Sequence, residues 1–303
     1  IEPKVKFFEI PWVKFINNVV IIGTCAFTAY LLLSNLPWYL PELGDGESVI
    51  PTFYFVVLAA ICFAVYSSTD IKYVRILSIA TTWLFIALIG FMWAGAFVLG
   101  DSEMSAFTSN VASIGVYFAN INEFVLPLND YHEFYLFWWF AWSIMIGQFT
   151  SRFVGGLKTY QVLGAMLIFP SIPIAIWFSV LYHYHDMGIP TQGIKNFAMV
   201  FVGVVFVINS LDSLIRLYTD NLNLTVKRLG KLNYMALNIV ALSLLTLLFK
   251  LEFLQIQWVG ALVIGLFFVC AGFIGYSKFK TVKNIDSSPK DNKIDYTKIE
   301  TVH

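Results

Sequence analysis

Eight long stretches without charged side chains are the feature that most constrains how this chain can fold. Their lengths suit helices that cross about 30 Å of hydrocarbon at a rise of about 1.5 Å per residue. Lipid offers no partner for backbone polar groups, and no alternating strand pattern is present, so these stretches must form α-helices. We therefore predict an all-α integral membrane protein with eight spans, at residues 15–41, 48–69, 76–100, 134–151, 159–182, 196–211, 232–249 and 253–277.

The composition excludes the soluble classes of protein. Hydrophobic residues make up 58% of the 303 residues and charged residues 13%, about half of the share that is usual in soluble domains. The net charge is zero, and no basic block is interleaved with aromatics, so we expect no nucleic-acid partner. Cys25, Cys62 and Cys270 lie inside apolar runs without metal-ligand spacing, so we expect buried free thiols.

The distribution of basic residues predicts the orientation of the chain in the membrane. If the N-terminus is cytoplasmic, 17 of the 19 Lys and Arg residues lie on the cytoplasmic side, and only Lys195 and Lys250 lie outside. The positive-inside rule therefore predicts a multi-pass protein of the cell (cytoplasmic) membrane with both termini in the cytoplasm.

Two segments are neither spans nor short loops. Residues 104–125 carry an apolar residue every three or four positions, with Ser, Thr and Asn opposite. This pattern predicts an amphipathic helix on the outer surface of the membrane or of the protein. The residues after Ser277 are rich in Lys, Asp and Ser with almost no apolar pattern, so we expect a disordered cytoplasmic tail.

The span 134–151 concentrates aromatic side chains. Trp142 follows Trp138 by four positions and Trp139 by three, so the rings occupy neighbouring positions on a helix. Ring faces carry negative potential and attract a quaternary ammonium, which forms no hydrogen bonds. An interfacial aromatic belt or plain helix packing is the alternative. Gly147 in the same span suits either a helix broken at a binding site or a close helix crossing.

The span 196–211 ends in a polar run that includes Asn209, Ser210, Asp212 and Ser213. Oxygen atoms on a helix in or near the membrane suit a hard cation, and an intramembrane carboxylate is costly without a role. The alternative is that Asp212 and Arg216, four residues apart, simply neutralise each other.

Signals for enzyme chemistry are weak. His183 and His185 have a spacing that can bind a metal, but no further Cys or His lies nearby, so an ordinary polar loop is the favoured interpretation. No nucleophile elbow, P-loop or HExxH motif occurs in the chain. We therefore expect that the protein is not an enzyme.

The aromatic span resembles the signature helix of the betaine/choline/carnitine transporter family, whose pattern is close to FYWAWWxSWSPFVGxFxARISRG. The matching residues run from Phe134-Tyr135 through the three tryptophans and Gly147 to Arg152 and Gly156. Three further segments are similar to family motifs: residues 72–78 to KGIKxLS, 164–178 to G…VP…LWF, and 207–213 to VTSADS. The resemblance covers residues from about 50 to 277.

The resemblance implies an inverted-repeat, leucine-transporter-like bundle, because the family has twelve helices, ten of them in two inverted five-helix repeats. It assigns the last three helices of the first repeat to residues 1–100, an external loop with the amphipathic helix to 101–133, the second repeat to 134–277 and the cytoplasmic tail to 278–303. The two opening helices of the first repeat and two peripheral helices would be missing. A chain that begins with Ile1 fits a fragment, and a naturally truncated relative is the alternative.

The resemblance also implies a function, the ion-coupled uptake of a quaternary-ammonium compatible solute of the glycine betaine, choline or carnitine type. It assigns the trimethylammonium group to a cage of Trp138, Trp139 and Trp142, together with Tyr135. A non-transporting or regulatory truncated membrane subunit, or an osmosensor, is the alternative function. The implied partners are this solute and the lipid bilayer, and a homo-oligomer is left open.

The same resemblance points to sodium as the coupling ion, and it implies no other cofactor. Phe206, Asn209 and Ser210 match family positions near a sodium site. Proton coupling or exchange is the alternative. The chain departs from the family where Ser143-Ile144-Met145 replaces Ser-Pro-Phe, so a Pro that helps to break the helix is absent, and where Asn209 replaces a Thr.

The predicted orientation can be tested with an introduced cysteine. We expect S102C to react in intact cells with a membrane-impermeant thiol reagent, because the loop 101–132 lies outside the cell in this topology. Protection of S102C in intact cells would contradict the prediction.

Overall fold

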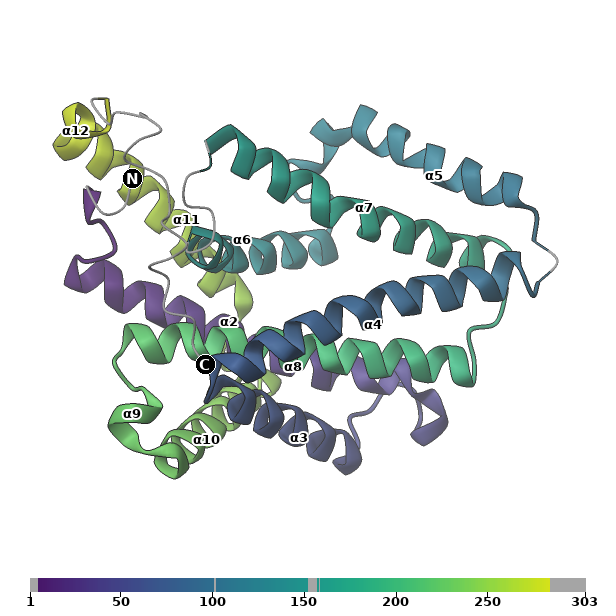
Figure 1. Ribbon diagram of the computed structural model, residues 1–303, viewed down its shortest axis with the longest axis horizontal. Coiled ribbons are helices and arrows are strands. Elements are labelled where there is room, and N and C mark those ends of the chain that lie inside the picture. The colour runs from purple at the N-terminus through teal and green to yellow at the C-terminus, as the bar shows by residue number, and fades with distance from the viewer. Residues whose placement is uncertain (1–4, 101, 152–156, 158, 284–303) are drawn as a thin grey trace.

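The structure, a computed structural model, describes residues 5–100, 102–151, 157 and 159–283. The prediction of an all-α membrane protein is confirmed, since the regular structure of these residues is helical and includes no strand (Figure 1). In chain order the helices are α2 (Pro11–Tyr39), α3 (Pro51–Ser68), α4 (Ile71–Phe97), α5 (Met104–Ala119), α6 (Asp130–Ser151), α7 (Thr159–Asp186), α8 (Ile194–Asn221), α9 (Val226–Leu229), α10 (Lys231–Lys250), α11 (Ile256–Phe273) and α12 (Phe279–Lys283).

Seven of the described helices are long and apolar enough to cross a membrane, namely α2, α3, α4, α7, α8, α10 and α11. Helix α6 forms where an eighth span is predicted but is not among the seven. Its indole, phenol and amide groups lower its mean hydropathy, because Trp and Tyr have a polar end as well as an apolar ring. The residues that make α6 a candidate site are thus the same residues that weaken its hydropathy signal.

The predicted spans coincide with helices, but α8 is much longer than the span 196–211 that the sequence predicts. It continues to Asn221 because the polar residues of its last turns find partners inside the fold. The buried part of this extension includes Asp212, Leu214, Ile215 and Tyr218. A hydropathy profile ends the span too early, since it counts such residues as solvent-seeking.

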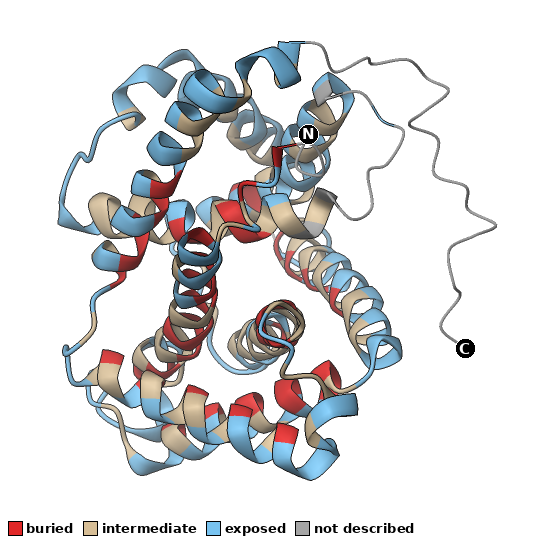
Figure 2. Cartoon of the chain, turned by 90° about the vertical axis from the view of Figure 1, so that its left-hand side faces the viewer, coloured by how far each residue is buried: buried red, intermediate tan, exposed pale blue. Residues whose placement is uncertain are grey.

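The main core surrounds α2, which packs against α3, α6, α8, α10 and α11. Buried residues lie on the inward faces of these helices, and exposed residues cover the outside (Figure 2). Because lipid tails are as apolar as leucine side chains, close packing and hydrogen bonds hold such a bundle together rather than the hydrophobic effect.

A second, smaller apolar cluster joins α4, α7 and α8. Its buried members include Met92 of α4, Tyr184 of α7 and Val202 of α8. The Tyr184 hydroxyl donates a 2.9 Å hydrogen bond to the carbonyl oxygen of Met92, which ties α7 to α4. Most of the rest of α7 is exposed along its length.

The amphipathic segment forms the helix α5, followed by a 3₁₀ turn at Ile121–Phe124. Helix α5 packs against α7, and its Phe107 ring contacts the Phe97 ring of α4 at 5.4 Å. The predicted helix is therefore confirmed, while its place at the outer surface stays a prediction. At the other end of the chain, residues 274–283 continue α11 as a π-turn and α12, so the predicted disordered tail does not begin at residue 278. Residues 284–303 lie outside the described part of the chain.

Helix α6 is continuous through Gly147, so the interpretation of this glycine as a break in the helix is wrong. A Pro at position 144 would remove a backbone hydrogen bond from the helix, whereas Ile144 keeps its N–H group. The close helix crossing lies instead at Gly260 of α11. A Cβ atom there would lie 2.7 Å from the carbonyl oxygen and from a ring carbon of Phe137 in α6.

This contact gives a prediction for stability. Gly260→Leu should lower the free energy of unfolding by about 1–3 kcal/mol, because the new side chain forces α6 and α11 apart. Gly265→Leu on the same helix is the matched control, since a Cβ atom there meets nothing within 4 Å. Thermal unfolding of both purified variants in detergent measures the difference, and equal midpoints would contradict the tight crossing.

Candidate functional site

Helix α6 is held against α2 near both of its ends. The Phe134 ring lies 5.6 Å from the Phe27 ring of α2, measured between centroids. Near the other end, the Gln148 side-chain amide donates to the Asn17 Oδ1 atom at 3.2 Å, and the Asn17 amide donates to Gln148 Oε1 at 3.5 Å. Sequence reasoning missed this amide pair, although amide side chains in two apolar spans are a signal for an interhelical hydrogen bond.

The predicted substrate residues share one face of α6. Tyr135, Trp138, Trp139 and Trp142 follow the spacing i, i+3, i+4, i+7, which places them along one side of a helix. Ring centroids lie 5.9 Å apart between Tyr135 and Trp138, and 5.2 Å apart between Trp138 and Trp139. The structure therefore brings these three rings into contact, with Trp142 one turn further along.

The tryptophans differ in their surroundings. Trp138 and Trp142 are partly buried and pack against the main core, whereas Trp139 is 56% exposed. One helix supplies only one wall of a cage, so a second element has to provide the rings or atoms on the opposite side of a ligand.

The indole N–H groups of Trp138 and Trp142 are buried without a hydrogen-bond partner among the described residues. An indole nitrogen is a donor only, and a buried donor without an acceptor destabilises a fold by about 1–3 kcal/mol. Two such donors one turn apart on the aromatic face have no acceptor in the described part of the chain, so this face has unsatisfied hydrogen-bonding capacity. This face combines ring surfaces for a cation with donors for an anionic group.

The predicted ion residues lie on α8, and two of them, Phe206 and Asn209, contact α4. The Phe206 ring meets the Phe85 ring edge-on at 5.4 Å. The Asn209 Oδ1 atom accepts a 2.9 Å hydrogen bond from the Ser78 hydroxyl, while Ser210 is half-buried. An amide oxygen has two lone pairs, so Asn209 keeps one for a cation. Within the described part of the chain, no ring contact or hydrogen bond joins these residues to the aromatic face of α6.

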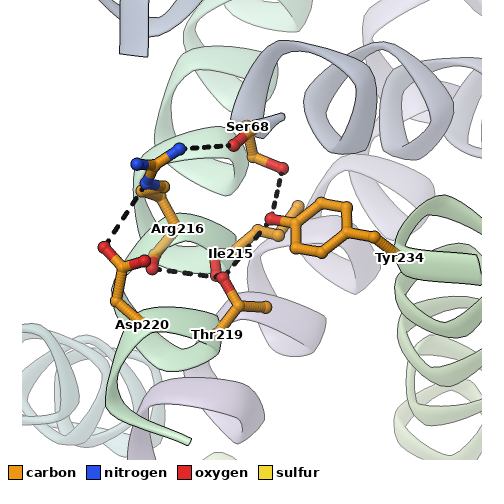
Figure 3. A network of polar contacts seen from close by, with 6 residues as sticks. All are labelled: Ser68, Ile215, Arg216, Thr219, Asp220 and Tyr234. Atoms are coloured by element: carbon orange, nitrogen blue, oxygen red, sulfur yellow. Dashed lines mark hydrogen bonds and ion pairs between the residues drawn. The ribbon is translucent and has the colours of Figure 1, made fainter. Parts of the chain in front are cut away.

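Asp212 is fully buried and accepts hydrogen bonds from two hydroxyls, one from α3 and one from α8. The Ser67 hydroxyl of α3 donates to its Oδ2 atom at 2.6 Å, and the Ser213 hydroxyl donates to Oδ1 at 3.1 Å. The expected alternative, an ion pair between Asp212 and Arg216, is wrong. The Arg216 Nε atom instead pairs with Asp220 Oδ2 at 3.3 Å (Figure 3).

A polar network at the same end joins α3, α8 and α10. The Tyr234 hydroxyl lies 2.9 Å from the Ser68 hydroxyl and 3.3 Å from the Thr219 hydroxyl (Figure 3). The Arg216 guanidinium also donates to the Ser68 carbonyl oxygen at 3.4 Å. Sequence reasoning missed this network because its members lie up to 166 positions apart.

The His-x-His segment forms the last turn of α7, so the interpretation as a polar loop is wrong. His183 is buried, its Nε2 atom lies 2.8 Å from the Ser102 hydroxyl, and its ring packs on Phe97 at 4.5 Å. His185 is exposed. Among the described residues, no group of three or more His, Cys, Asp or Glu side chains could hold a metal ion.

The three cysteines are free thiols, as the sequence predicts. Cys25 is fully buried in the main core, while Cys62 and Cys270 are half-buried. The expectation of burial therefore holds completely only for Cys25.

Several curated proteins that the chain resembles are named as transporters. It is 23% identical to glycine betaine transporter 1 of Vibrio parahaemolyticus over 140 residues, which are 46% of this chain and 26% of that protein. It is 25% identical to uncharacterized transporters of Mycobacterium bovis and Mycobacterium tuberculosis, over 34% of this chain and 23% of each of those proteins. No protein-family model matches the chain, and no solved structure does.

The chain spans about a quarter of the length of the curated relatives that it matches. These relatives share the designation of transporter, and the name of one of them states its solute, glycine betaine. Together with seven helices suited to crossing a bilayer, these similarities support a multi-pass membrane transporter.

Proposed function

We propose that this protein serves the ion-coupled uptake of a quaternary-ammonium compatible solute and that the aromatic face of α6 binds the solute. The observation that carries the proposal is the pair of buried, unpartnered indole N–H groups of Trp138 and Trp142 on a face that also presents Tyr135 and Trp139. The named solute of one relative, glycine betaine, belongs to the same chemical class.

The chemistry of a zwitterion matches this face at both ends. Ring faces attract a trimethylammonium group with about 0.5–2 kcal/mol per well-placed ring. The two indole N–H groups offer hydrogen bonds to the carboxylate of a betaine or carnitine molecule. A primary amine loses more hydration free energy when it enters the site, because a strongly hydrated ammonium gives up its hydrogen bonds to water. The face thus favours a quaternary zwitterion over both a primary amine and an alcohol such as choline.

The proposed coupling ion is sodium, bound near Phe206, Asn209 and Ser210. The hydrogen bond from Ser78 fixes the Asn209 amide, so its oxygen points in a defined direction before an ion arrives. Oxygen ligands of this kind suit a hard cation. The orientation proposed for the chain places both termini in the cytoplasm, in agreement with the distribution of basic residues.

Variants of Trp142 test the substrate face. Trp142→Leu should weaken the binding of both glycine betaine and choline about 5- to 30-fold, equivalent to about 1–2 kcal/mol, because it removes the ring. Trp142→Phe keeps a smaller ring but removes the N–H group, so it should weaken glycine betaine more than choline. Isothermal calorimetry or a binding assay with labelled solute on the purified protein measures both affinities.

Trp83→Leu is the control for these variants. Trp83 is 66% exposed on α4, so its replacement should leave solute affinity unchanged. If the Leu and Trp forms at position 142 bind glycine betaine equally well, the indoles are packing residues and the proposed solute loses its physical basis.

The ion proposal has its own test. Uptake in proteoliposomes should rise with external sodium, and Ser210→Ala should shift this dependence to higher sodium concentration, because one oxygen ligand is lost. Ser213→Ala, which alters a hydroxyl bonded to Asp212 instead, is the matched control on α8. Uptake that is independent of sodium would reject the ion assignment and leave the solute proposal standing.

A further inference from the structure

A pocket of about 260 Å³ lies at the end of the bundle where α3, α8 and α10 meet. It is distinct from the aromatic face of α6, and the transport proposal makes no use of it. Figure 3 shows four of its lining side chains, those of Arg216, Thr219, Asp220 and Tyr234, gathered between these helices. Thr225 and Lys227, in the connection from α8 to α10, also line the pocket.

The charges of the pocket do not balance. Two cations and one carboxylate line it, and the carboxylate of Asp220 is already paired with Arg216 at 3.3 Å. The Lys227 ammonium is exposed and makes no ion pair or hydrogen bond with the described residues. The pocket therefore carries an uncompensated positive charge.

Unused hydrogen-bond donors point to the kind of ligand. A guanidinium has five N–H groups, and Arg216 uses its Nε atom for Asp220 and its Nη1 atom for the Ser68 carbonyl oxygen, so others remain. The Thr225 hydroxyl forms no capping hydrogen bond, although this residue precedes α9. The donors thus come from α8 on one side and from the connection to α10 on the other.

We propose that this pocket binds a phosphate group, supplied either by inorganic phosphate or by the headgroup of an anionic lipid. A phosphate presents acceptor oxygens in several directions and carries negative charge, which matches a guanidinium, an ammonium and a hydroxyl that arrive from different elements. A planar carboxylate would engage fewer of these donors at once. The basic residues at this end place the pocket on the proposed cytoplasmic side, within reach of both sources.

Lys227→Gln is the decisive variant, because Lys227 is exposed and its replacement leaves the packing intact. The neighbouring Arg228→Gln is the matched control. Arg228 is also exposed, but it does not line the pocket, and it donates to the Asn223 carbonyl oxygen. The full chain, purified in detergent, is unfolded thermally at constant ionic strength with chloride exchanged for inorganic phosphate. A second series adds phosphatidylglycerol or phosphatidylcholine instead.

We expect a ligand-induced rise in the unfolding midpoint for the wild type and for R228Q. For K227Q, the apparent affinity for the added ligand, obtained from the dependence of the midpoint on ligand concentration, should fall about tenfold. A Lys227-dependent effect of inorganic phosphate assigns the site to the free ion, and one of phosphatidylglycerol alone assigns it to a lipid headgroup. No effect of either ligand, or equal effects in K227Q and R228Q, would overturn the proposal. None of these outcomes depends on the transported solute.

Discussion

The packing of α2 against five other helices is the interaction on which the rest of the bundle depends. Lipid provides no hydrophobic force between spans, so the contacts have to come from shape and from satisfied polar groups. The buried hydroxyls of Thr24 and Thr28 donate to carbonyl oxygens one turn earlier in α2, at 2.8 Å each. Both hydroxyls are satisfied in this way, and the small Thr side chains keep the surface of α2 narrow, which lets neighbouring backbones approach.

Polar contacts between helices then fix how the elements sit around α2. The amide pair of Asn17 and Gln148 holds α6, and the Ser67–Asp212 hydrogen bond holds α3 against α8. Inside a membrane each such group has few alternative partners, so a single hydrogen bond selects one register between two helices. The aromatic face of α6 depends on this selection, because a rotation of the helix would turn Trp138 and Trp142 away from the core.

Stretches without charged residues were sufficient to predict where the long helices lie, because the requirement for internal backbone hydrogen bonds in lipid acts on each span separately. The face shared by Tyr135 and the tryptophans could also be predicted, since it depends only on spacing along α6. The partner of Arg216 could not. Asp212 and Asp220 both lie four residues from it, and only the Ser67 hydroxyl from a distant helix shows which carboxylate is already engaged.

Other polar contacts depend in the same way on helices that the sequence alone does not bring together. His183 would be a plain surface residue by spacing, yet Phe97 and Ser102 enclose it. The long α8 has the same cause, since its polar last turns are stable only because α3 and α10 supply partners such as Ser68 and Tyr234. The Trp-rich sequence of α6 shows the opposite problem, because the side chains suited to a ligand reduce the evidence for a span.

The attachment of α7 has a consequence for how the protein opens. This helix meets the rest of the bundle through the small cluster around Met92 and through the Tyr184 hydroxyl, while α2 is enclosed on most sides. Resistance to local unfolding is therefore uneven, since segments with few buried contacts open at lower free energy than the global transition. We therefore expect helices α5 and α7, which pack on each other, to open at lower free energy than the core around α2.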